Sequence, residues 1–359
     1  MKKQYGLAGA VLSAIAGMAS AQSNVVIYGI ADAGITHESG GAAGSLTKVN
    51  SGAASASRIG FKGTEELGGG LSAIFLLESG YKIDTGDIDA AGTLFNRQAY
   101  VGLKSTAGTM TLGRQYTPYH STLASVADPF GTGLAGTSKN LFPDSGANVR
   151  SSNTVLYASP VANGVSGELA YSFGEKSSTS TGRQFGGAIG YAQGPLTVRL
   201  AYNSKNGDVE TAPGITVHNG TGRNTLLAAN YDFKVVKLFA AYGVDKGFNS
   251  APLGNANNPY GGVRPTASTD GNEILLGFTA PVGGGSLIAS VMRKDDKTAF
   301  NQDARSWGVG YIYPLSKRTS LYGAYAAIHN RNGAGYTVAN NSESGSGNRG
   351  MNLGVRHSF

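Results

Sequence analysis

The chain contains no cysteine, few charged residues and no long uninterrupted apolar segment. Without cysteine it can form no disulfide, thiolate-bound metal site or cysteine nucleophile. A membrane-spanning helix needs about 20 consecutive apolar residues, and no segment of the sequence reaches that length, which excludes a helical span. Charged residues make up 14% of the 359 positions and the net charge is +7. The basic residues are dispersed without blocks of one sign, so we expect no nucleic-acid partner.

The first 21 residues predict a cleaved secretory signal. Lys2 and Lys3 precede a short apolar run at residues 7–18, and Ala19-Ser20-Ala21 is a small-residue cleavage site. The apolar run is too short to anchor the protein in a bilayer. We therefore expect residues 1–21 to be removed during export, and residues 22–359 to form one domain.

Period-two alternation dominates the rest of the sequence and predicts β-strands. In LTVRLAYNSK, which begins at Leu196, the residues Leu196, Val198, Leu200 and Tyr202 share one face, and polar residues occupy the other. Similar alternation occurs at residues 165–173, 224–233, 236–245, 307–313 and 351–359. A soluble sandwich also alternates. Segments of about ten residues, with Tyr and Phe near their ends, instead favour tilted transmembrane strands and an interfacial aromatic girdle.

The links between these segments alternate between short and long, as in outer-membrane barrels. Seven short links, most of them marked by Gly or Pro, are predicted at residues 67–70, 105–108, 160–164, 193–195, 233–235, 282–285 and 315–319. Longer polar stretches lie near residues 37–54, 84–94, 118–150, 174–183, 204–222, 246–271, 294–303 and 330–348. We interpret the long stretches as surface loops. The count predicts an all-β fold, a sixteen-stranded antiparallel transmembrane β-barrel, whose lumen is too wide for side chains to fill and therefore holds water.

Several stretches resemble the trimeric porins of β-proteobacteria, the group that includes the neisserial and Burkholderia–Bordetella porins. The resemblance is carried by NVVIYGIADAGI, SRIGFKGTEELGGGLSAIFLLESGY, LFNRQAYVGLKSTAGTMTLGRQYTP and the C-terminal NLGVRHSF. It implies a homotrimer in the outer membrane of a Gram-negative bacterium, surrounded by lipid and lipopolysaccharide and conducting small ions and solutes. It also implies that Phe359 ends a signal that the outer-membrane assembly machinery recognises.

The same resemblance implies that the loop after the fifth strand folds into the lumen as a constriction. That loop is Pro118–Arg150, which carries Asp128, Asp144 and Arg150. By resemblance, the arginines of the opposing wall correspond to Arg58 and Arg97. Fixed guanidinium groups in a constriction attract anions, and facing carboxylates create a transverse field.

The parity of positions along a strand tests these assignments, because successive side chains point to opposite faces of the sheet. If Ile59 faces the membrane, Arg58 and Lys62 face the lumen. Arg97 instead shares the parity of Val101, which should face outward. A bulge could reverse that parity, or Arg97 could lie in the trimer interface or above the membrane. Any of these charges could also be a solvated charge at the rim. Further inward positions by the same parity are Glu78 and Lys104.

No catalytic, metal or cofactor site is expected. The stretch GTGLAGTSK lacks the order of a phosphate loop, the five histidines have no metal-ligand spacing, and His120–Ser121 alone makes no triad. The sequence therefore predicts a mildly anion-selective channel for passive diffusion of small hydrophilic solutes, not an enzyme. Two alternatives stay open: a substrate-specific channel with an ordered aromatic or arginine track, and an adhesin whose barrel is only an anchor.

Overall fold

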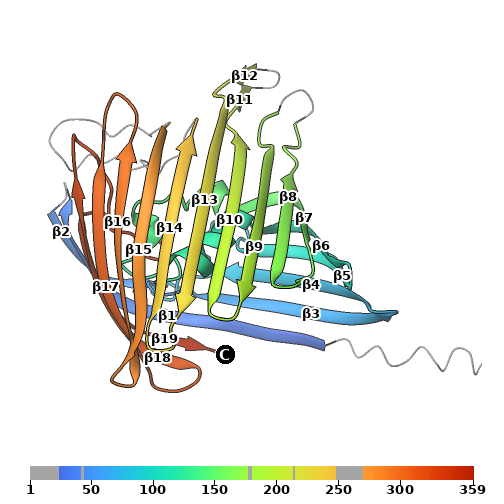
Figure 1. The fold of residues 1–359 in the computed structure, drawn as a ribbon, viewed down its shortest axis with the longest axis horizontal. Helices are drawn as coiled ribbons and strands as arrows, with labels where there is room; N and C mark the ends of the chain where they lie inside the picture. Colours follow the sequence, from blue (N-terminus) through green and yellow to red (C-terminus); the bar gives the residue numbers. More distant parts are fainter. Residues whose placement is uncertain (1–23, 42–43, 177–179, 213–214, 248–269) are drawn as a thin grey trace, which may run out of the picture.

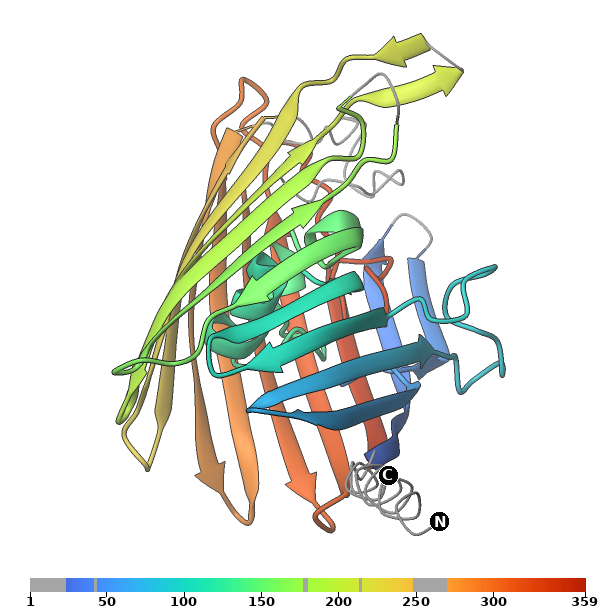
Figure 2. The same ribbon diagram turned by 90° about the vertical axis from the view of Figure 1, so that its right-hand side faces the viewer.

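The computed structural model describes residues 24–41, 44–176, 180–212, 215–247 and 270–359, so the predicted signal peptide lies outside the described residues. The strands form one closed antiparallel sheet, seen from two sides in Figures 1 and 2. Its strands are β1 (Asn24–Gly41), β2 (Gly44–Ser51), β3 (Arg58–Gly68), β4 (Leu71–Gly80), β5 (Gln98–Ser105), β6 (Gly108–Tyr116), β7 (Arg150–Ala158), β8 (Val165–Ser172), β9 (Gln184–Gln193), β10 (Leu196–Asn206), β13 (Thr221–Asp232), β14 (Lys237–Lys246), β15 (Asp270–Val282), β16 (Gly285–Asp296), β17 (Ala304–Pro314), β18 (Thr319–Asn330) and β19 (Arg349–Ser358). A separate hairpin, β11 (Val209–Ala212) and β12 (Ile215–Val217), stands beyond the rim (Figure 2).

The barrel closes through β1, which pairs with β19 on one edge and with both β2 and β3 on the other. β2 and β3 are two halves of one strand, because Ala33 of β1 faces Ser51 and Ile30 faces Arg58. Counting the halves as one strand confirms the predicted sixteen. The chain between the halves, residues 52–57, leaves the sheet and enters the lumen side of the barrel.

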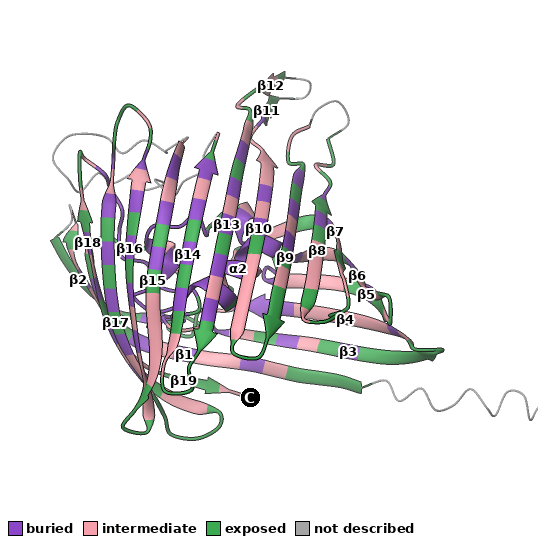
Figure 3. Cartoon of the chain, viewed as in Figure 1, coloured by how far each residue is buried: buried purple, intermediate pink, exposed green. Residues whose placement is uncertain are grey.

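The alternation seen in the sequence places apolar side chains on the outer surface, where a lipid environment makes their exposure favourable. Val101 and Leu103 on β5 are 58% and 51% exposed. Buried and exposed residues alternate along the strands in Figure 3. Tyr157 and Tyr191 lie a few residues before short turns, consistent with the predicted girdle. Within the described part of the chain, no helix has the length and apolar character required to cross a membrane.

All seven short links are found as predicted, between consecutive strands at one end of the barrel. Most of the loop predicted at residues 246–271 lies outside the described residues, and among the described ones two of the predicted surface loops are wrong. Residues 37–54 mostly continue β1 and β2, which pair up to Gly41 opposite Gly44. Residues 331–348 fold inward, and positions 334–340 are all buried.

The long segment between β6 and β7 also folds inward, as predicted for the loop after the fifth strand. It contains α2 (Pro118–Thr122), η2 (Leu123–Ala127), η3 (Ser138–Asn140) and η4 (Gly146–Asn148), which lie inside the ring of strands in Figure 2. We call residues 118–149 the inward loop. Its fully buried Tyr119 and Phe142 belong to one apolar cluster with Leu226 and Leu275 of the wall. The inward loop is therefore fixed to the wall at β9, β10, β13 and β14.

The C-terminal residue completes the closure of the barrel. The backbone groups of Phe359 and Gly29 exchange two hydrogen bonds of 3.1 Å, and a Cβ at Gly29 would come within 2.3 Å of the Phe359 ring. Glycine is needed there because the ring covers the backbone of β1.

Since Val at this position would displace the ring, Gly29→Val is expected to reduce the folded fraction several-fold. Heat-modifiable migration after refolding would measure it, with Gly167→Val as the control, because a Cβ at Gly167 would meet its nearest atom, the Ala188 carbonyl oxygen, at an ordinary 3.7 Å.

Candidate functional site

The three predicted arginines border one cavity of about 1140 Å³ inside the barrel. Arg58 begins β3, Arg150 begins β7, and Arg97 immediately precedes β5. Glu78 of β4 joins two of them: its Oε1 accepts from Arg97 Nε at 2.7 Å, and its Oε2 lies 3.8 Å from Arg58 Nη1. One carboxylate thus offsets part of the repulsion among three guanidinium groups.

Tyr116, the last residue of β6, holds the other side of the cluster. Its hydroxyl oxygen accepts from Arg97 Nη2 at 2.7 Å and from Arg150 Nη2 at 2.9 Å. The Arg150 guanidinium also lies over the Tyr116 ring, 4.5 Å from its centroid, and the ring of His120 stacks on the same tyrosine at 4.8 Å. These contacts fix the positions of like charges that would otherwise separate.

The parity conflict at Arg97 arises because this residue is not in a regular strand. β5 begins at Gln98, and the Arg97 N–H donates to the Glu78 carbonyl at 3.2 Å. Strand alternation fixes side-chain direction only within the ladder, so the Arg97 side chain can point inward, where it is 4% exposed.

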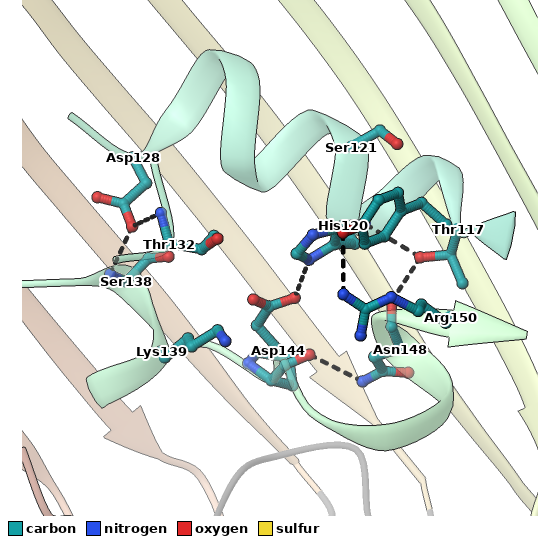
Figure 4. Close-up of polar contacts among 12 residues, drawn as sticks. Thr117, His120, Ser121, Asp128, Thr132, Ser138, Lys139, Asp144, Asn148 and Arg150 are labelled. Carbon is teal, nitrogen blue, oxygen red and sulfur yellow. Dashed lines mark hydrogen bonds and ion pairs between the residues drawn. The ribbon is translucent and has the colours of Figure 1, made fainter. Parts of the chain in front are cut away.

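The inward loop supplies the facing groups, drawn in Figure 4. Asp144 Oδ1 lies 2.6 Å from His120 Nδ1, and an ionised carboxylate can only accept, so Nδ1 carries the proton. Lys139 Nζ donates to the Asn341 carbonyl at 2.8 Å. Asp144 and Lys139 border the same cavity as the arginines.

Asp128 does not border this cavity. It is 3% exposed, and its carboxylate accepts hydrogen bonds from the backbone N–H groups of Phe130, Thr132 and Ser138 at 2.8–3.0 Å. Figure 4 shows it turned into the inward loop, away from Arg150. This placement argues against the predicted role in selectivity and gives Asp128 a role in folding the loop.

Lys62 faces the lumen as parity predicts, but it borders a different cavity from the arginines. Its Nζ lies 5.2 Å from the centroid of the Tyr28 ring. The six predicted residues thus separate into three places: Arg58, Arg97, Arg150 and Asp144 around the large cavity, Asp128 inside the loop, and Lys62 farther along the wall.

Sequence reasoning missed that three distant segments meet at the site. The Leu134 N–H donates to the Ala53 carbonyl at 2.7 Å, which joins the inward loop to the break between β2 and β3. Asn341, from the segment before β19, donates through Nδ2 to the Thr132 carbonyl at 3.1 Å, and its Oδ1 accepts from the Ala56 N–H at 2.8 Å. The only sequence signal was the small-residue run GAASAS at 52–57, which allows close backbone approach.

The contact between Asp144 and His120 should make the position of the inward loop sensitive to acid. Burial alone would raise the pKa of Asp144, but the charge and hydrogen bond of His120 outweigh burial and hold this pKa below its ordinary value. The Asp144 carboxylate is therefore fully ionised above about pH 4, the ordinary aspartate value, and its contact with His120 is lost as the pH falls through the lowered pKa. Current fluctuations from loop opening are expected only below about pH 4 in the unmodified protein.

Asp144→Asn is expected to show the same fluctuations already at pH 7, because the variant has no carboxylate facing His120 at any pH. Single-channel recordings between pH 7 and pH 3 would measure this. Quiet currents in the variant across that range would show that the pair does not hold the loop.

Comparison with known proteins gives consistent matches. A family model described as Gram-negative porin matches residues 8–333. Outer membrane porin protein 32 of Delftia acidovorans is 33% identical, and the alignment covers 100% of this chain and 100% of that relative. An outer membrane porin protein of Bordetella pertussis is also 33% identical, over 91% of this chain and 94% of that relative. The structure of an anion-selective porin from Comamonas acidovorans superimposes with a TM-score of 0.73 at 29% identity, covering 94% of this chain and 100% of that one.

Proposed function

Because the chain belongs to the Gram-negative porin family, we propose that the arginine cluster of Arg58, Arg97 and Arg150 makes its channel favour small anions over cations. The protein is an outer-membrane β-barrel that forms a channel for passive diffusion, and its family is not a class of enzymes. The solved relative described as anion-selective supports the proposed sign of selectivity.

The observation that carries the proposal is the imbalance of charge around the large cavity. Six basic and three acidic side chains border it: Arg58, Arg97, Arg114, Lys139, Arg150 and Lys205 against Asp89, Asp144 and Glu343. Such a surplus raises the local anion concentration in a narrow water-filled passage with low-dielectric walls. Guanidinium groups keep this charge at every pH at which the protein functions.

The test is the reversal potential of the purified protein in a planar bilayer under a potassium chloride gradient. We expect a reversal potential whose sign indicates chloride preference. Its magnitude should be modest because carboxylates remain near the arginines. A clear potassium preference would overturn the proposed selectivity, and the absence of any conductance would overturn the channel.

We further propose that the mature protein comprises residues 22–359 and works as a homotrimer in contact with lipid and lipopolysaccharide. The band of exposed apolar residues on the strands supports a lipid-facing surface. The position of Phe359 at the barrel seam supports its proposed recognition by assembly machinery. N-terminal sequencing of the exported protein and migration of the unheated oligomer would test cleavage after Ala21 and the trimer.

A further inference from the structure

A second cavity, of about 400 Å³, lies on the inner wall where β1, β3, β4 and β5 run side by side. It lies toward the end of the barrel that carries the short turns, since it includes Glu66 and Ser72 on either side of the turn between β3 and β4. The helical turns of the inward loop pack instead against strands β7 to β10, β13 and β14, and no residue of positions 118–149 lines this cavity.

The residues of this cavity form rows across the sheet. Val26 pairs with Lys62, Lys62 with Leu76, and Leu76 with Tyr100. Paired residues face the same side of a sheet, and Leu76 lies two residues from Glu78, which binds the lumen arginines. The row therefore faces the lumen.

The apolar character of this wall is unusual for a surface in contact with water. Ile74 lies next to Leu76 on the same face, and both are only partly buried. Val26 is 39% exposed. Apolar side chains on the membrane face are explained by lipid, but these face the aqueous lumen, where their exposure has a cost unless a solute covers them.

Two ammonium groups border the same apolar surface. Lys62 and Lys104 both line the cavity, and neither forms an ion pair within the part of the chain that the structure describes. The one carboxylate of the cavity, Glu66, accepts a hydrogen bond from Ser72 Oγ at 2.9 Å. The charge balance of the cavity is therefore positive.

We propose that this cavity is a subsite for anions with an apolar body, namely aromatic monocarboxylates. The carboxylate pairs with Lys62 or Lys104, and the ring covers Ile74, Leu76 and Tyr100. A volume of about 400 Å³ accommodates one such ring. The inference rests on the proposed function, because the arginine cluster supplies the anions that reach this wall.

Benzoate is the probe, and gluconate is the hydrophilic carboxylate for comparison. In planar bilayers with potassium chloride on both sides, benzoate is expected to reduce the chloride current in a saturable manner, at concentrations about tenfold lower than gluconate. The apolar surface that one aromatic ring buries against the wall is sufficient for a difference of about tenfold in blocking concentration.

The variants Leu76→Ser and Ile74→Ser are expected to raise the half-blocking benzoate concentration about tenfold while leaving gluconate block unchanged, since they remove only apolar contact. Leu156→Ser is the matched control, because Leu156 lies opposite Thr111 on the inner face of β7 and outside the cavity. Lys62→Gln together with Lys104→Gln is expected to weaken block by both anions.

Equal block by benzoate and gluconate, or benzoate block that survives Leu76→Ser and Ile74→Ser, would overturn the subsite even in a channel that prefers chloride. A channel without chloride preference that still shows benzoate block sensitive to Leu76→Ser would support the subsite and overturn the proposed role of the arginines. The reversal potential recorded in the same membranes separates the two failures.

Discussion

Replacing Arg58 with glutamate is expected to convert a chloride-preferring channel into one that prefers potassium. The substitution changes the local charge by two units in the large cavity. The new carboxylate would lie beside Glu78, whose Oε2 is 3.8 Å from Arg58 Nη1, and repulsion would drive it toward the lumen. Two unit charges about 10 Å from a passing ion change its energy by ~0.8 kcal/mol even in a water-like dielectric, a factor of about four.

Because anions and cations shift in opposite directions, the permeability ratio of chloride to potassium is expected to fall by more than about tenfold. The measurement is the reversal potential in a salt gradient. Arg58→Lys keeps the charge and should retain the preference. Arg318→Glu makes the same charge change in a short turn at the end of the barrel and should have little effect. A ratio that does not move in Arg58→Glu would remove Arg58 from the ion pathway.

Removing the carboxylate of Asp128 is expected to loosen the inward loop without changing the sign of selectivity. Besides three backbone N–H groups, the carboxylate accepts from Thr137 Oγ1 at 3.3 Å. Each hydrogen bond to a charged acceptor contributes about 1.5–3 kcal/mol, so Asp128→Ala removes several kcal/mol from this part of the loop. The donors left behind are buried, which adds to the loss.

We expect Asp128→Ala to show at least about twofold higher and noisier single-channel conductance, together with faster proteolysis within residues 118–149, because a loop without these bonds opens locally. Asp128→Asn retains the shape and part of the hydrogen bonding and should be intermediate. If Asp128 instead acted as a lumen charge, Asp128→Ala would raise chloride preference and leave the current quiet and the loop resistant to protease.

The sequence by itself determined the barrel. Alternation such as that of Leu196, Val198 and Leu200 depends only on which side of a strand faces lipid, and short turns depend on local Gly and Pro. Both signals are local, so strand count, topology and the inward parity of Arg58 and Lys62 follow from the order of residues along the chain. The resemblance to the porins then indicated which long loop enters the lumen.

Only the tertiary structure decided how the lumen is filled. Arg97 escapes parity because it precedes its strand, and Asp128 turns into its own loop because backbone N–H groups there need an acceptor. The contacts of Asn341 with Ala56 and Thr132 join segments far apart in the chain. Irregular loops have no period, and the contacts that place them are non-local, so no pattern along the sequence records where these side chains meet.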